Sequence, residues 1–413
     1  MPSVCFYFQV HQPWRVKRYR VFDIGKDSSY FNEGGEANYN NQRILEKVAR
    51  KSYLPANAVM LELLQKHPEF RISYSFSGVF LEQLEKFSPE TLDSFKRLVE
   101  TGRVEILSET YYHSLSALFS PQEFREQVGL HREKIKKLFG YTPRVFRNTE
   151  LIYSNAIAKE AEAMGYRGIL AEGADHVLEW RSPNFLYSPK GTKKIALLLK
   201  NYRLSDDIAF RFSSRDWAEF PLTAPKFAGW VNAVNGGGEV VNLFMDYETF
   251  GEHQWEDTGI FNFLRALPEE ILKHPDNSFV TPSESIARYT PTAELDIPNP
   301  ISWADIERDL SAWLSNDMQR EAAKRVYDLE DAVRKTGDSE LLHDWRRLQT
   351  SDHFYYMCTK WWSDGDVHKY FSPYNSPYEA FIYFMNTLHD LELRIGYNTD
   401  KKESLKKSER VKV

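Results

Sequence analysis

The feature that most constrains the fold is the alternation of short apolar segments with longer helical segments over residues 4–281. Strands that alternate with helices predict a parallel sheet covered by helices, and eight strands suit a barrel better than an open sheet. The segments have the length and the β-branched and aromatic content of buried strands. They are Val4–Val10, Phe70–Phe76, Arg103–Ser108, Arg144–Arg147, Gly168–Glu172, Ile195–Lys200, Val240–Met245 and Phe279–Thr281.

The boundaries of the intervening helices are also marked. Ser88–Thr101 and Ser120–Gly140 each begin with serine followed by proline, a cap and first-turn residue that favour helix initiation. Leu54–His67 places its leucines on one face. No G-x-G-x-x-G follows the first strand, and Gly236-Gly237-Gly238 precedes a strand, so it predicts a turn and not a phosphate loop.

The pattern changes after residue 290, which predicts a second domain. Residues 291–301 hold three prolines among polar residues and are typical of a linker. We therefore predict an α/β barrel over residues 1–290, a helical bundle over 302–396 and a charged, disordered tail over 397–413. The expected bundle helices, with Trp303, Trp313 and Trp345 at core positions, are Ser302–Asn316, Asp317–Thr336, Ser339–Phe354 and Ser376–Ile395.

Composition narrows the classes of function. The net charge of −6 offers no general basic surface for a phosphate backbone, which argues against nucleic-acid binding. Aromatic residues make up 15% of the chain, more than a core alone needs, and aromatic faces stack well on sugar rings. Two cysteines, no targeting pattern in the first residues and no apolar run of about 18 residues predict a soluble, cytoplasmic protein without membrane contact.

Groups that can do chemistry follow four of the predicted strands. His11 follows the first strand, Glu109 and His113 follow the third, and Glu150 follows the fourth. Asp246 follows the strand Val240–Met245, and His253 comes seven residues later. Each has a structural interpretation: a hydrogen-bonded histidine, a helix cap or the partner of an arginine. Together they predict one site, because catalytic groups of α/β barrels lie at the carboxyl ends of the strands.

Two carboxylates that face one cleft admit three chemistries. They can cleave a glycosidic bond, hold a divalent metal together with histidines, or bind a cationic ligand. The aromatic content and the absence of H-x-x-x-H and H-E-x-x-H spacings favour glycosidic cleavage.

Five ordered motifs then resemble those of glycoside hydrolase family 57, whose members are retaining enzymes acting on α-glucans. The segments around Glu109 and Trp361 are most similar to the α-amylase-type members. The motifs are His11-Gln12-Pro13, Gly102–Ile106 with Tyr111-Tyr112-His113, Arg147–Leu151, Phe244–Gly251 and Ser351–Tyr356.

The resemblance implies a fold and roles for residues. The fold is an incomplete barrel of seven strands followed by a helical bundle that closes the cleft, so Ile195–Lys200 or Phe279–Thr281 is expected outside the barrel. Glu150 matches the nucleophile and Asp246 the acid/base, and neither a cofactor nor a metal is expected. The residues expected to bind an α-glucan or maltooligosaccharide are His11, Trp14, Glu109, His113, His253, Asp352, Tyr355 and Trp361.

Three alternatives stay open at this point. The same intermediate intercepted by a sugar hydroxyl would give a 4-α-glucanotransferase. A metal-dependent hydrolase with a similar barrel, and a non-catalytic glucan-binding protein, are the other two.

Overall fold

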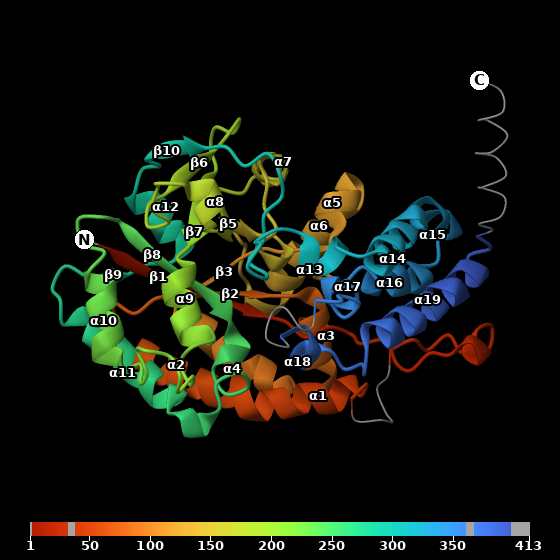
Figure 1. Cartoon of the computed structure of the whole chain (residues 1–413), viewed down its shortest axis with the longest axis horizontal. Coiled ribbons are helices and arrows are strands. Elements are labelled where there is room, and N and C mark those ends of the chain that lie inside the picture. The colour runs from red at the N-terminus through yellow and green to blue at the C-terminus, as the bar shows by residue number, and fades with distance from the viewer. Residues whose placement is uncertain (1, 32–37, 361–366, 398–413) are drawn as a thin grey trace. The chain divides into compact units, whose positions relative to one another are not determined.

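The computed structural model describes residues 2–31, 38–360 and 367–397 (Figure 1). The chain folds into two compact units. Unit 1 comprises Met1–Gln12, Gln42–His113 and Pro121–Leu310, and unit 2 comprises Pro13–Asn41, Ser114–Ser120 and Ser311–Val413. The division into barrel, linker, bundle and tail stays a prediction, and residues 398–413 of the tail lie outside the described residues.

Unit 1 contains a strand at each of the eight predicted places, which confirms an α/β fold. Two short strands, β6 (Tyr187–Pro189) and β10 (Ala293–Leu295), are additional, and β10 lies within the predicted linker. The eight are β1 (Ser3–Val10), β2 (Ile72–Phe76), β3 (Val104–Ile106), β4 (Val145–Arg147), β5 (Gly168–Glu172), β7 (Ala196–Lys200), β8 (Val240–Asp246) and β9 (Ser278–Phe279).

The strands form two sheets, in the orders β3-β2-β1-β8 and β10-β6-β7-β5-β4. Every pair is parallel except β6 with β7. The sheets are linked twice, by a bridge between Ser108 and Phe146 and by the Asn201 N–H, which donates to the Asn242 carbonyl at 2.9 Å. β9 pairs only with Ser3 and Val4 of β1, whereas β7 pairs along its whole length with β5.

Side chains alternate between the two faces of the strands, as the period of two requires. On β1, Phe6 and Phe8 pack into a large apolar core with helical residues, and Tyr7 points the other way. Tyr7 joins a second cluster, the interior cluster, to which most of the linked strands contribute. Its members are Tyr7, Leu107, Val145, Leu151, Leu170, Leu198 and Phe244.

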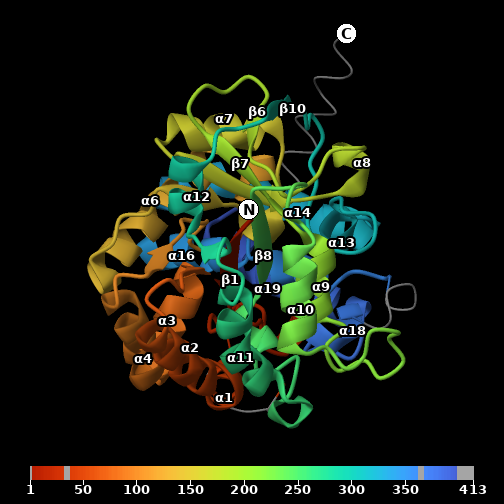
Figure 2. The same ribbon diagram turned by 90° about the vertical axis from the view of Figure 1, so that its left-hand side faces the viewer.

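Helices cover the outer side of unit 1, and α2 (Leu54–Lys66) packs against α4 (Pro89–Glu100) and α11 (Ile260–Leu272) (Figure 2). The helices predicted at Leu54–His67, Ser88–Thr101 and Ser120–Gly140 are confirmed to within two residues. The other helices of this unit are α1 (Asn41–Val48, which begins at the last residue of a unit 2 segment), α3 (Gly78–Phe87), α6 (Pro121–Phe139), α7 (Asn155–Ala163), α8 (Asp175–Leu178), α9 (Tyr202–Ala209), α10 (Ala224–Asn232) and α12 (Pro282–Arg288).

Unit 2 is helical, and Trp313 and Trp345 are buried in it as predicted. Three of the four predicted bundle helices are present among its described residues. The helices predicted over Asp317–Thr336 and Ser339–Phe354 are each divided into two consecutive helices, and the third matches Ser376–Ile395. The helices are α5 (Ser116–Phe119), α13 (Ser311–Leu314), α14 (Asp317–Asp328), α15 (Glu330–Thr336), α16 (Ser339–Arg347), α17 (Ser351–Tyr355), α18 (Val367–Phe371) and α19 (Pro377–Arg394).

The helix predicted over Ser302–Asn316 is wrong, because only Ser311–Leu314 is helical. Residues 302–310 belong to unit 1, where the Ser302 N–H donates to the Arg308 carbonyl at 3.0 Å. Asp305 and Arg308 have left-handed backbones, with φ of 56° and 55°, which breaks a right-handed helix. Trp303 therefore does not belong to the core of unit 2.

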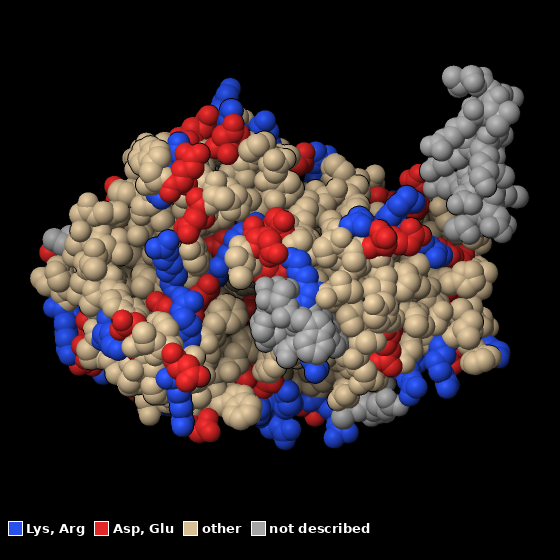
Figure 3. Space-filling view, in the orientation of Figure 1, with Lys and Arg blue, Asp and Glu red and all other residues tan. Residues whose placement is uncertain are grey.

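Two surface properties bear on the predicted partners. Acidic and basic side chains are interspersed over the face shown in Figure 3. Among the helices that the structure describes, none combines the length and the apolar character that crossing a bilayer requires.

Candidate active site

The parallel register brings the ends of three strands together in unit 1. Gln9 of β1 lies opposite Asp246 of β8, and Val10 lies opposite Phe76 of β2. The residues that follow these strands therefore start side by side. His11, after β1, has its Nδ1 atom 2.6 Å from the Oγ atom of Ser77, after β2.

A chain of hydrogen bonds leads from the strand interior to the first glutamate. Tyr7 Oη and Ser75 Oγ donate to Gln9 Oε1 at 2.8 and 3.0 Å. The Gln9 amide then donates to Glu109 Oε1 at 3.2 Å, and Glu109 Oε2 lies 2.9 Å from His113 Nδ1. Glu109 is fully buried, so its position is fixed by these partners.

His113 lies between two carboxylates. Its Nε2 atom is 3.2 Å from Glu150 Oε1, opposite the contact with Glu109. A carboxylate only accepts, so both ring nitrogens donate when the imidazole is protonated. Burial alone would lower the pKa of His113, but the hydrogen bonds with Glu109 and Glu150 raise it to about 9. Burial alone would raise the pKa of Glu109, but the hydrogen bond and the charge of His113 lower this pKa to about 2.

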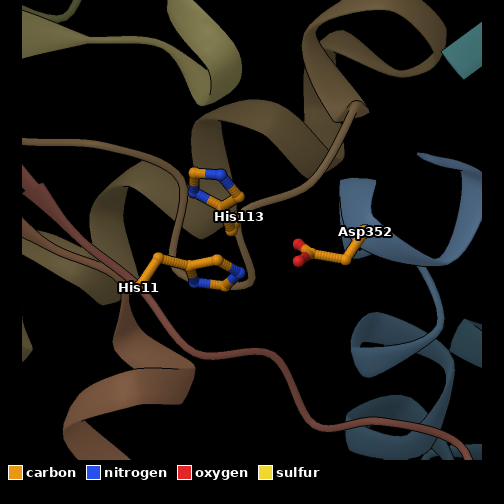
Figure 4. Close-up of side chains that lie close together, drawn as sticks. All are labelled: His11, His113 and Asp352. Carbon is orange, nitrogen blue, oxygen red and sulfur yellow. The ribbon is translucent and has the colours of Figure 1, made fainter. Parts of the chain in front are cut away.

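The two histidines of the site are stacked. The ring centroids of His11 and His113 are 4.0 Å apart, with 21° between the ring planes (Figure 4). His113 is buried and His11 is partly exposed, so His11 is the more accessible ring of the pair.

Glu150 is held by both of its carboxylate oxygens. It lies in a short 3-10 helix, Thr149–Leu151, with φ of 56° and ψ of 26°, a strained conformation for a non-glycine residue. Besides the contact of Oε1 with His113, Oε2 accepts a hydrogen bond from the indole Nε1 of Trp303 at 2.8 Å. Two donors favour the ionised carboxylate and fix its orientation.

Asp246 is in the opposite electrostatic situation. It ends β8 on the side of Phe244, which belongs to the interior cluster, and it is partly exposed. Burial and the nearby charge of Glu150 raise the pKa of Asp246 to about 6, against the smaller opposing effect of Arg147. Glu248 lies two residues further on, and burial followed by the charge of Asp246 raises its pKa as well. Tyr53 donates a short hydrogen bond to Glu248.

The other predicted site residues are distributed over both units. His253 follows β8, its N–H donates to the Glu248 carbonyl at 3.0 Å, and burial lowers its pKa to about 4. Trp14, Asp352 and Tyr355 belong to unit 2, and their predicted approach to a sugar stays a prediction. Trp361 lies outside the described residues.

Within unit 2 those three residues have defined neighbours. The Arg347 guanidinium lies 4.5 Å from the centre of the Trp14 ring. Tyr356 Oη donates to Asp352 at 3.4 Å, and the Tyr355 ring stacks on His368 at 4.2 Å between centroids.

Three residues of the site were not predicted: Gln9, Glu248 and Trp303. Gln9 precedes His11 by two residues and so shares its face of the strand, a signal that alternation could have provided. Glu248 lies in the 3-10 helix Tyr247–Thr249 that follows β8, where the alternation rule does not apply. Trp303 is 153 positions from Glu150 and carries no local pattern that could place it there.

The α/β fold brings two carboxyl groups, Glu150 and Asp246, to one end of its strands, an arrangement that is typical of the glycosidases with two acidic groups. Residues 5–298 match the family model described as glycosyl hydrolase family 57. The chain therefore belongs to glycosyl hydrolase family 57, and it is a glycoside hydrolase. This membership overrules the non-catalytic alternative.

The similar proteins include enzymes named for two related activities. The chain is 45% identical to a protein of Methanocaldococcus jannaschii named "Putative alpha-amylase", over 98% of this chain and 86% of that protein. It is 27% identical to an alpha-amylase of Pyrococcus abyssi and 22% identical to a 4-alpha-glucanotransferase of Thermococcus litoralis. Each of these two matches covers 62% of this chain but 38% of the relative, so the chain spans well under half of their length.

Two solved structures share the fold. A GH57-type branching enzyme of Pyrococcus horikoshii superimposes with a TM-score of 0.67 at 15% identity, over 96% of this chain and 95% of that one. The 4-alpha-glucanotransferase of Thermococcus litoralis gives 0.64 at 18% identity, over 86% of this chain and 56% of that one.

Proposed function

We propose that the chain hydrolyses α-1,4-glucans by double displacement, with Glu150 as nucleophile and Asp246 as acid/base. The observation that carries this proposal is the contrast between the two carboxyl groups. Glu150 accepts hydrogen bonds on both oxygens, which favours the ionised form, while burial and the charge of Glu150 raise the pKa of Asp246 to about 6. A nucleophile and a proton donor need these opposite states.

The proposed reaction has two steps. Glu150 attacks the anomeric carbon and forms a covalent glycosyl-enzyme intermediate, while Asp246 gives its proton to the departing glycosidic oxygen. Asp246 then takes a proton from water, which attacks the same carbon and releases Glu150. Two inversions give net retention of the anomeric configuration.

The surrounding residues would hold the sugar and the nucleophile. We propose that His11, His113 and His253 contact sugar hydroxyls from unit 1, and that Trp14, Asp352 and Tyr355 do so from unit 2. Glu109 is fully buried, so we propose that it acts by orienting His113.

We further propose that seven strands of unit 1 form the incomplete (β/α)7 barrel that the family resemblance implies, with the helical bundle closing its cleft. The two links between the sheets and the interior cluster support a closed arrangement of β1, β2, β3, β4, β5, β7 and β8. The free cysteines, Cys5 and Cys358, agree with the cytoplasmic location that we propose.

The decisive test is Glu150→Gln, which keeps the size of the side chain and removes its charge. We expect turnover of soluble starch and maltooligosaccharides to fall by at least about 10⁴-fold, because the nucleophile is lost. Binding of maltoheptaose and the melting temperature should stay near those of the parent. A variant that keeps activity within a few-fold of the parent would remove Glu150 from this role.

Asp246→Asn is the companion variant. We expect its first step to recover with substrates that carry a good leaving group, since such a group departs without a proton. The second step still needs a base, so a glycosyl-enzyme intermediate should accumulate and be visible by mass spectrometry. Equal loss with good and poor leaving groups would argue against Asp246 as the acid.

A 4-α-glucanotransferase is the second candidate, favoured by the relatives of that name. It uses the same intermediate, which a sugar hydroxyl intercepts in place of water.

A further inference from the structure

A loop of unit 1, residues 302–308, lies directly against the nucleophile turn. Ile301 and Tyr153 exchange two backbone hydrogen bonds of 2.9 Å, which ties the start of the loop to the strand end that carries Glu150. The Trp303 N–H also donates to the Glu150 carbonyl at 3.3 Å. We call residues 302–308 the Trp303 loop. It thus contacts Glu150 through its backbone as well as through the indole.

The side chain of Arg308, at the end of the loop, binds both the loop backbone and two acidic residues. One of its guanidinium nitrogens, Nη1, donates to the Trp303 carbonyl at 2.5 Å and to Glu172 Oε2 at 3.2 Å. The other, Nη2, donates to Asp206 Oδ2 at 3.4 Å. Glu172 and Asp206 are both buried, so these bonds are shielded from water and hold more strongly than surface ion pairs.

Lys200 completes this buried charge cluster. Its Nζ atom lies 3.0 Å from Asp206 and 3.6 Å from Glu172. Glu172 and Lys200 are the last residues of β5 and β7 and are paired in register. The cluster is therefore built on the ends of two strands and on Asp206 of α9, and it anchors Arg308.

The indole of Trp303 is held by the same neighbourhood. The Arg147 guanidinium and the Lys200 ammonium lie 5.0 and 5.4 Å from the ring centre, within the range of cation–π attraction. The ring also packs against the interior cluster. Its position, and so the direction of its N–H, is fixed from several sides.

We propose that Arg308 is a positioning residue for catalysis, which locks the Trp303 loop so that the Trp303 indole holds Glu150 ionised and aimed at the anomeric carbon. The proposal rests on the proposed role of Glu150 as nucleophile. A hydrogen bond to the charged form of a carboxyl group lowers its pKa, and small displacements of a reacting group cost much of the rate.

Other charged groups also act on Glu150. His113 contacts its second oxygen, with Glu109 behind, and Asp246 interacts with it electrostatically. Arg147 and Lys200 lie against the Trp303 ring. A substitution at Arg308 leaves the contacts of His113 with Glu150 and Glu109 in place. Lys200 shares Glu172 and Asp206 with Arg308, so a variant of Trp303 itself is needed beside the Arg308 variant.

The test compares Arg308→Gln with the matched control Arg203→Gln. Both guanidinium groups lie over the Tyr202 ring, at 4.9 and 5.8 Å, but Arg203 pairs with the exposed Asp175. With maltoheptaose, we expect kcat of Arg308→Gln to fall between about 10- and 100-fold, with KM changed little and the acidic limb of the pH profile moved to higher pH. Arg203→Gln should match the parent.

Trp303→Phe provides a second variant, which keeps an aromatic ring at this position and removes the indole N–H donor. We expect the same loss of kcat and the same shift of the acidic limb. Parent-like kcat and an unmoved pH profile in both Trp303→Phe and Arg308→Gln would overturn the proposal, as would equal loss in Arg203→Gln.

A measurement without turnover separates this proposal from the proposed function. Carbon-13 NMR of labelled glutamate, with Glu150→Gln to assign the signal, gives the pKa of Glu150 directly. We expect it to rise in Trp303→Phe and Arg308→Gln. If the pKa of Glu150 rises in both variants but the parent cleaves no α-glucan, only the proposed function is contradicted. If the parent is active but the pKa of Glu150 is unchanged in both variants, only the positioning role is contradicted.

Discussion

At the scale of single residues, the site is organised around groups whose backbone is strained. His113 and Glu150 both have left-handed conformations, with φ of 51° and 56°. Each such residue costs about 1–3 kcal/mol and persists only where its surroundings hold it. Here the surroundings are the hydrogen bonds of Glu109 and Trp303, so the same contacts that fix the charge of the nucleophile also maintain its conformation.

Glu109→Gln should reveal how His113 acts. His113 has a raised pKa, so the stability that its ion pairs contribute is complete below its ordinary pKa and is lost as the pH rises through about 9. Without the charge of Glu109, burial lowers this pKa, so the stabilising charge of His113 should be lost at a pH about 1–3 units lower than in the parent. The measurement is the melting temperature against pH, whose alkaline decline should begin at a lower pH in Glu109→Gln.

Glu160→Gln is the control for this prediction, because Glu160 of α7 forms an exposed pair with Arg125 of α6. It should leave the pH dependence of the melting temperature unchanged. An alkaline decline at the same pH in Glu109→Gln and in the parent would show that His113 does not set it.

At the scale of elements, the strands were predictable and the loop that completes the site was not. Short, nearly continuous apolar runs identify β1 and β8, and the polar residues at the ends of these runs identify His11 and Asp246. The Trp303 loop carries no periodic pattern, and its conformation depends on Arg308 reaching charges that lie more than a hundred positions earlier. Long-range ion pairs of this kind leave no local signal, which is why a helix was predicted there.

Helix α12 offers a test of local stabilisation without an effect on chemistry. Thr281 accepts from the Glu284 N–H, and Glu284 accepts from the Thr281 N–H, which forms a capping box. Thr281→Ala should lower the free energy of unfolding by about 1 kcal/mol, since one donor of the first turn loses its partner. Chemical denaturation measures this loss of stability, and kcat should not change. The control is Thr359→Ala, because Thr359 is exposed and lies outside the helices. Equal stability of the two variants would show that the cap contributes nothing.

At the scale of the whole molecule, the family and the α/β fold follow from the sequence, but the fate of the glycosyl-enzyme intermediate does not. Water and a sugar hydroxyl compete for the same carbon, and their competition depends on how the complete site excludes water. The named relatives include both amylases and glucanotransferases.

Incubation with maltoheptaose should therefore distinguish the two activities. We expect only products shorter than seven glucose units, sized by chromatography, because hydrolysis is the proposed reaction. Glu150→Gln incubated in parallel gives the background. Products longer than seven units would assign the chain as a transferase that works through the same carboxylates.

The Trp303 loop also has a consequence for biosynthesis. Glu150, Asp246 and His113 leave the ribosome well before Trp303 and Arg308, because the indole that binds the nucleophile is 153 positions later than Glu150. A nascent chain that ends before the loop holds both carboxyl groups but lacks one donor to the nucleophile. The hydrogen bonds of the nucleophile are thus completed only after the last segment of unit 1 has been synthesised.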